Sequence, residues 1–168
     1  MQTGQTSQTA QFVSILRAHH YLFAPSPKIL DDSLAQKFCG LDSPEGVRAH
    51  VEGVIAMFSE LSDPESAVTF VRRIEHSVCI RSRLLEERVK ELRETGLKQL
   101  VFLGAGLDTT AYRASALLNG IDVFEVDHPD TQRHKRALLQ EWDIDVPKNL
   151  RFGRLVSGSY SAKMRLCS

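Results

Sequence analysis

The spacing of apolar residues indicates helices throughout the first half of the chain. Between residues 9 and 23, and again between about 30 and 38, apolar side chains recur as they do on one buried face of a helix. Pro25 and Pro27 separate these segments, because the residue before a proline disfavours helical backbone. We therefore expect two helices joined by a loop.

Two further helices are indicated by a shared start signal. Residues 43–45 (SPE) and 63–65 (DPE) each combine a capping side chain, a proline at the first helical position and an acid in the first turn. The second helix is expected to run to about Thr95, where Gly96 would close it. Its arginines and glutamates are expected to form an exposed face with weak surface pairs.

At residue 97 the pattern changes to one of strands alternating with helices. Residues 100–103 (LVFL) form a continuous apolar run, which predicts a parallel strand buried on both faces. This run ends in Gly104-Ala105-Gly106, and a helix is expected to follow as far as Leu118. A second strand is expected over residues 121–126, ending at Asp127.

The remainder continues the alternation, with a helix opened by Pro129 and a third strand that begins at Leu150. This order predicts an α/β protein, namely a partial doubly wound, Rossmann-like sheet preceded by a helical region. Because such crossovers are right-handed, the ligand crevice lies at the carboxyl ends of the strands, where Gly104 and Asp127 are located.

These positions favour a nucleoside-type ligand. Glycines at the turn allow positive φ and close approach of a ligand, and the amides of Gly106 to Asp108 are expected to open a helix and face a polar group. Asp127 lies 21 residues beyond Gly106, where an acid ending the second strand can accept hydrogen bonds from a ribose diol. The alternative is that the glycines only form a turn and that Asp127 only caps the next helix.

The identity of the ligand is narrowed by Thr109. A dinucleotide fold needs a third glycine three residues after Gly106, so that the backbone can approach a pyrophosphate, and Thr109 occupies that position. S-adenosylmethionine contains no phosphate, so the departure favours this methyl donor over NAD. An NAD-binding oxidoreductase is the less favoured alternative.

Composition and charge argue against several other classes of partner and binding site. The chain has 21 basic and 21 acidic residues, so nothing favours nucleic acid or an anionic membrane as a partner. Its three cysteines are far apart, which suggests reduced thiols in a cytoplasmic protein. None of the six histidines pairs with a cysteine or histidine at a metal-ligand spacing, so we expect no metal site.

Two segments resemble the leucine carboxyl methyltransferase-like family of class I S-adenosylmethionine-dependent methyltransferases. They are residues 100–113 (LVFLGAGLDTTAYR) and residues 123–136 (VFEVDHPDTQRHKR). The upstream residues 9–38 and 80–91 are similar to the family's N-terminal helices. The resemblance covers about residues 9–152, and GAGLDT with EVDHP is its most specific part. It implies methyl transfer to an oxygen nucleophile of a small molecule or a protein, in particular a carboxylate. The reaction needs no covalent intermediate with the enzyme, and we assign no catalytic residue.

The resemblance also implies roles for individual residues. Asp127 would bind the ribose hydroxyls, and Glu125 is the alternative because both side chains lie on the same side of the strand. An arginine before the first strand would hold the cofactor's carboxylate, and the sequence does not choose between two candidates. The expected cofactor-binding residues are Arg81, Arg83, Gly104, Ala105, Gly106, Asp108, Glu125 and Asp127.

The predicted organisation is a disordered tail (1–8), a helical region (9–95), the start of the cofactor-binding domain (96–152) and an atypical tail (153–168). That last segment, GRLVSGSYSAKMRLCS after Phe152, does not resemble the family's continuation of the third strand. We therefore expect an N-terminal fragment of a methyltransferase, with a catalytically inactive truncated remnant as the alternative. Neither oligomeric state nor the methyl acceptor is indicated.

Overall fold

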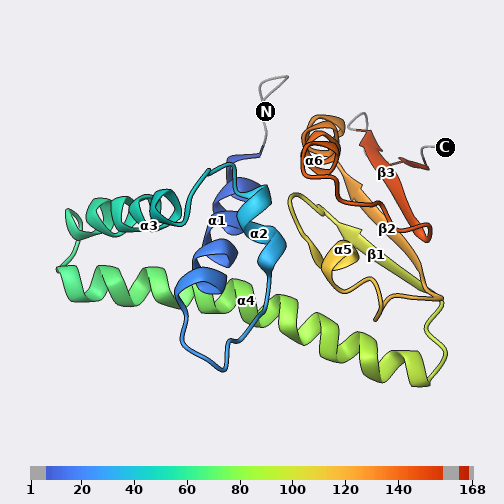
Figure 1. Ribbon diagram of the computed structural model, residues 1–168, viewed down its shortest axis with the longest axis horizontal. Helices are drawn as coiled ribbons and strands as arrows, with labels where there is room; N and C mark the ends of the chain where they lie inside the picture. The colour runs from blue at the N-terminus through green and yellow to red at the C-terminus, as the bar shows by residue number, and fades with distance from the viewer. Residues whose placement is uncertain (1–6, 157–162, 167–168) are drawn as a thin grey trace. The chain divides into compact units, whose positions relative to one another are not determined.

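The computed structural model describes residues 7–156 and 163–166. These residues form two compact units that divide within the longest helix (Figure 1). Residues 11–85 form a helical unit, and the described residues on either side of that range form a unit built around a sheet. Across the described part of the chain, no helix combines the length and the apolar character needed to cross a membrane.

The helical unit contains most of α1 (Gln8–Phe23), α2 (Ser33–Phe38), α3 (Pro44–Ser59) and most of α4 (Pro64–Glu94). Both predicted start signals are confirmed: Ser43 Oγ accepts a hydrogen bond from Gly46 N at 3.0 Å, and Asp63 Oδ1 accepts one from Ser66 N at 2.9 Å. The long helix ends at Glu94, and Gly96 adopts a φ of +91° just beyond it.

Apolar residues of all four helices meet in the core of this unit. Leu16 on α1 is completely buried, as is Val47 on α3. A buried ion pair joins Arg17 to Asp32, with 3.4 Å between Nε and Oδ2, and Asp32 also caps α2 by accepting from Ala35 N. The core consists of Ile15, Leu16, Ala18, Ala35, Cys39, Val47, Val51, Val71 and Val78.

The second unit has a four-stranded sheet in the order β1 (Gln99–Leu103), β2 (Asp122–Asp127), β3 (Leu150–Val156) and β4 (Lys163–Leu166). The first three strands are parallel, and β4 pairs antiparallel with β3. A short helix, α5 (Thr110–Arg113), follows β1, and α6 (Pro129–Glu141) connects β2 to β3. The predicted α/β class is thereby confirmed, with the helical region first and a small parallel sheet after it.

The prediction that β1 is buried on both faces is wrong. Val101 retains 45% of its exposure and Leu103 retains 75%, and only Leu100 and Phe102 are half-buried. The reason is that β1 lies at the edge of the described sheet, where it pairs with β2 alone and one of its faces is not covered. Apolar composition therefore identified the strand correctly but not its environment.

The helix after β1 is also shorter than predicted, since α5 ends at Arg113 and not near Leu118. The following backbone forms turns whose carbonyl groups accept from side chains elsewhere in this unit. Arg93 Nη1 donates to the Leu117 carbonyl at 2.7 Å, and Asn149 Nδ2 donates to the Leu118 carbonyl at 2.9 Å. These donors, distant in the sequence, hold the turns that follow α5 in place.

Candidate active site

The glycine loop between β1 and α5 is fixed to the neighbouring strand. Gly104 N donates to the Val126 carbonyl at 2.8 Å, and Ala105 N donates to the same oxygen at 3.3 Å. Gly104 has a φ of +67° and Gly106 a φ of +52°, a region that side chains other than glycine adopt at a cost. The turn thus needs glycine at both positions where the sequence has it.

The two glycines differ in their surroundings. A methyl group added to Gly106 would lie 3.1 Å from the Cβ of Ala10, which belongs to the same unit, whereas one added to Gly104 would meet no protein atom within 4 Å. Gly104 is exposed. The backbone at Gly104 is therefore the part of the loop that a ligand can approach, and Gly106 is where the loop packs against its own unit.

Asp127 joins the loop to the end of β2. Its Oδ2 accepts from Gly106 N at 2.5 Å, and its Oδ1 accepts from His128 N at 2.6 Å. The side chain is half-buried at the carboxyl end of the strand. Because each carboxylate oxygen has two lone pairs, these two bonds leave capacity for further donors such as hydroxyl groups. The two motifs that sequence analysis selected separately are therefore in direct contact.

The simpler interpretation of Asp127 as the cap of the next helix does not match the geometry. His128 caps α6, and its Nδ1 accepts a hydrogen bond from Asp130 N at 3.2 Å. This also assigns His128 a structural role at the start of α6. The hydrogen bonds of the Asp127 carboxylate come from the amides of Gly106 and His128, and neither residue lies within α6.

The amides of residues 106–108 do not open a helix, contrary to the sequence prediction. Gly106 N is bonded to Asp127, and Asp108 N donates to the Ala105 carbonyl at 2.9 Å. The helix begins later, at Thr110, whose amide donates to Asp108 Oδ1 at 2.8 Å. Asp108 therefore stabilises the exit from the loop.

Glu125 lies on the same strand but is only 2% exposed. Its Oε2 is 2.8 Å from Lys135 Nζ, and the Tyr112 hydroxyl donates to the same oxygen at 3.3 Å. Burial raises the pKa of the Glu125 carboxyl above its ordinary value, with Lys135 opposing the shift, and burial together with Glu125 raises the pKa of Tyr112. Because Glu125 is occupied inside the unit, the geometry favours Asp127 as the residue that meets a ligand.

Gln132 on α6 reinforces this arrangement through the backbone. Its Nε2 donates to the Glu125 carbonyl at 3.0 Å and to the Gly153 carbonyl at 2.5 Å, so that one side chain joins β2 and β3. The sequence alone does not identify Gln132 or Lys135 as polar core residues. Their helical segments looked amphipathic, and only the fold reveals which polar groups face the sheet.

The two candidate arginines lie on α4 in the helical unit. Arg81 and Arg83 are both exposed, and both precede the division between the units. The choice between them as the residue that holds a cofactor carboxylate therefore stays open. Further along α4, Arg88 pairs with Glu91 at 2.6 Å, as expected for an exposed surface face.

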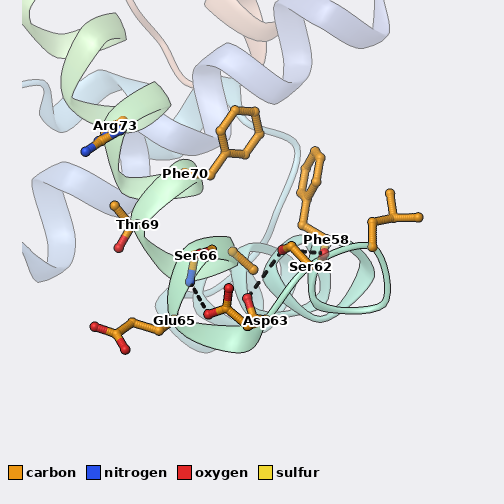
Figure 2. A pocket seen from close by; sticks show the side chains of 10 residues that line it. Phe58, Ser62, Asp63, Glu65, Ser66, Thr69, Phe70 and Arg73 are labelled. Carbon is orange, nitrogen blue, oxygen red and sulfur yellow. Dashed lines mark hydrogen bonds between the residues drawn. The ribbon is translucent and has the colours of Figure 1, made fainter.

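A hollow of about 620 Å³ lies at the turn between α3 and α4 in the helical unit. Figure 2 shows Phe58 and Phe70 on its wall, with Ser62, Asp63 and Arg73 among the polar residues that line it. The two aromatic rings are in edge-on contact, with 4.9 Å between their centroids. Leu61 at its rim is 81% exposed. Sequence analysis did not indicate this hollow, because it depends on how the two helices meet.

A cluster of histidines around Glu75 is a second feature that sequence spacing did not indicate. His19 Nδ1 lies 2.6 Å from Glu75 Oε2, and His20 Nδ1 lies 3.3 Å from Glu75 Oε1. Burial raises the pKa of Glu75, but the contacts with His19 and His20 outweigh it, so that the net pKa is below its ordinary value. More than 50 positions separate Glu75 from the two histidines, which conceals the cluster in the sequence.

Comparison with known proteins identifies relatives across most of the chain. The sequence model of the family described as leucine carboxyl methyltransferase matches residues 10–157. A Bacillus subtilis protein, YktD, whose name describes it provisionally as an S-adenosyl-L-methionine-dependent methyltransferase, is 31% identical over 160 residues, which are 90% of this chain and 52% of that protein. A protein of Mycobacterium sp. strain KMS with the same provisional description is 30% identical over 118 residues, 67% of this chain and 44% of the relative.

A Streptomyces coelicolor protein of the same provisional description is 32% identical over 81 residues, 48% of this chain and 28% of its own length. The chain therefore spans about half the length of YktD and less of the other two. The names of these relatives include S-adenosyl-L-methionine, and this is the cofactor that the glycine loop and Thr109 favour in the sequence. The match over residues 10–157 covers more than half of the sequence, and the chain belongs to the leucine carboxyl methyltransferase family.

Proposed function

We propose that this chain binds S-adenosylmethionine at the carboxyl ends of β1 and β2, through the Gly104–Asp108 loop and Asp127. The observation that carries the proposal is the hydrogen bond from Gly106 N to Asp127 Oδ2, which brings the glycine loop and the acid ending β2 into one site. The open space at Gly104 supports it, because a ligand can approach the backbone there.

The chemical fit is to a nucleoside that carries no phosphate. Asp127 would accept hydrogen bonds from the ribose hydroxyls with its remaining lone pairs. Ala105 and Asp108 would shape the loop. When bound, S-adenosylmethionine supplies a methyl group on a positively charged sulfur. An acceptor oxygen can bond to the methyl carbon directly, and the sulfur leaves with the electrons of the broken C–S bond.

We further propose that the acceptor of the complete enzyme is a carboxylate or hydroxyl oxygen, as its family suggests. A carboxylate is already ionised at neutral pH and needs no general base, so catalysis would depend mainly on positioning the two reactants. Glu125 is not assigned to proton transfer, because Lys135 and Tyr112 occupy it.

The proposed domain division is a helical region over residues 9–95 and a cofactor-binding part from residue 96. A cytoplasmic location is proposed from the reduced thiols, of which Cys39 is buried.

The proposal is tested by calorimetric titration of S-adenosylmethionine into the wild type and Asp127→Asn. Losing charged hydrogen bonds to a ribose corresponds to about 1.5–3 kcal/mol, so we expect affinity to fall about 10- to 150-fold. Asp122→Asn is the matched control, because Asp122 is an exposed acid on the same strand. Unchanged affinity in Asp127→Asn, or an equal loss in both variants, would show that Asp127 does not contact the ribose.

A protein that binds S-adenosylmethionine without transferring its methyl group is the second candidate, because the residues proposed here bind the cofactor and Glu125 is occupied by Lys135 and Tyr112. The two functions are separated by incubating the chain with methyl-labelled S-adenosylmethionine and small carboxylic acids or peptide C-termini. Labelled ester would support the enzyme. Tight cofactor binding without transfer to any acceptor would favour the non-catalytic alternative.

A further inference from the structure

The cluster around Glu75 belongs to the helical unit and shares no residue with the glycine loop. His19 and His20 lie near the end of α1, and Glu75 and His76 lie on α4, which passes the C-terminal end of α1 in Figure 1. His20, Glu75 and His76 each offer one ligand atom, and these three atoms lie within 4.8 Å of one another. Within the described residues, this is the group whose donors converge in that way.

The spacing of these donors suits a small cation. In a tetrahedral zinc site with bonds of about 2.0–2.1 Å, neighbouring ligand atoms are about 3.4 Å apart. His20 Nδ1 and Glu75 Oε1 are already 3.3 Å apart. His76 is exposed on α4, so its ring can complete the site by a small change of side-chain torsion.

The burial of the three residues resembles that of a site with one open position. His20 is 2% exposed and Glu75 is 6% exposed, so that the packing of α1 against α4 holds both. His76 is exposed and leaves the cluster accessible from solvent. Two imidazoles and one carboxylate are a donor set that zinc uses, with water as the fourth ligand.

We propose that His20, Glu75 and His76 form a zinc site outside the methyltransferase centre. His19 would not bind the zinc ion itself but would orient the Glu75 carboxylate. Its Nδ1 lies 2.6 Å from the second oxygen of Glu75, the kind of contact that orients a metal-binding carboxylate. The site would join α1 to α4 within the helical unit.

Zinc binding has a specific consequence for His20. In the structure, its Nε2 accepts a hydrogen bond from Ile29 N at 3.2 Å, so the ring proton is on Nδ1 and faces Glu75. A cation at Nδ1 replaces that proton, and the neutral ring then carries its proton on Nε2. The contact with Ile29 N is lost in the process. Zinc binding therefore changes the tautomer of His20 and the environment of the Ile29 amide.

The test is calorimetric titration of zinc chloride into the full chain, after removal of metal with a chelator that is then dialysed away. We expect one zinc ion per chain in the wild type and an affinity at least tenfold lower in His76→Ala. His50→Ala is the control, since His50 is an exposed histidine on α3 in the same unit, and its affinity should be unchanged. His19→Ala should weaken binding by about tenfold, as outer partners of metal ligands typically do.

Because His76 is exposed, its replacement should leave the fold intact, which circular dichroism verifies. Nitrogen-15 NMR of the histidine rings gives a readout that surface binding would not move: the tautomer of His20 should switch as zinc is added. The proposal is overturned if the folded chain shows no saturable zinc binding. It is equally overturned if His76→Ala and His50→Ala bind alike, or if zinc leaves the His20 tautomer unchanged.

Discussion

Replacing Lys135 by methionine tests whether the polar core behind β2 stabilises the sheet unit. Lys135 and Glu125 form an ion pair with 2.8 Å between Nζ and Oε2, and their side chains are 1% and 2% exposed. Methionine is a linear side chain of similar length, so the change removes the charge and leaves the packing nearly intact. The carboxylate of Glu125 then keeps the Tyr112 hydroxyl but loses its counter-ion.

The expected loss is large because solvent cannot replace the ammonium. Removing one partner of a buried ion pair costs about 3–5 kcal/mol of unfolding free energy. Protonation of Glu125 can reduce this loss in the variant, because burial already raises the pKa of this carboxyl. A pKa that is higher in the folded than in the unfolded protein means that the folded state binds the proton more tightly. Stability of Lys135→Met should therefore fall as pH rises above the ordinary glutamate value of about 4.3.

The assay is urea unfolding of the wild type, Lys135→Met, Glu125→Gln and the double variant at pH 5 and pH 8. The double variant should be more stable than the sum of the single losses predicts, by about 1–3 kcal/mol, because neither charge is left alone. The deficit of Lys135→Met should be greater at pH 8. A loss below about 1 kcal/mol at pH 8, or losses that simply add, would refute the reasoning.

Three other predictions follow from local geometry. Ser43→Ala removes the cap of α3 and should cost about 0.5–2 kcal/mol in urea unfolding; no change would mean that the cap is not formed in solution. Leu16→Ala, at a fully buried position, should cost about 2–5 kcal/mol, whereas Leu61→Ala, at an 81% exposed position, should stay within about 0.5 kcal/mol; equal losses would contradict the placement of the core. Gly106→Ala combines a φ of +52° with a methyl group 3.1 Å from Ala10, so it should lower both the melting temperature and the S-adenosylmethionine affinity; a variant unchanged in both would show that the loop tolerates a side chain.

The elements that could be predicted from the sequence are those specified by neighbouring residues. Helices α3 and α4 begin at Pro44 and Pro64 as expected, because a cap and a proline act within one turn. The strands β1 and β2 and the glycine turn between them were also found, since apolar runs and glycine are local signals. The contact between Gly106 and Asp127 follows from parallel pairing of β1 with β2.

Features that depend on distant partners could not be predicted in the same way. The turns that replace the second half of the expected helix after β1 are held by Arg93, which donates to the Leu117 carbonyl from another part of the chain. The role of Glu125 depends on Lys135, and nothing in the amphipathic pattern of α6 shows that this lysine faces the sheet. Strand alternation predicts that Glu125 and Asp127 share one side of β2, but it does not distinguish a buried carboxylate from one at the crevice.

The central claim is most directly tested by calorimetric titration of the 168-residue chain with S-adenosylmethionine, its demethylated product and NAD. Circular dichroism of the same sample establishes that the chain is folded. We predict saturable binding of S-adenosylmethionine and of the product at one site per chain, and no binding of NAD, because Thr109 occupies the position where a dinucleotide needs a third glycine. A folded chain that binds neither S-adenosylmethionine nor its product, or that binds NAD instead, would contradict the account.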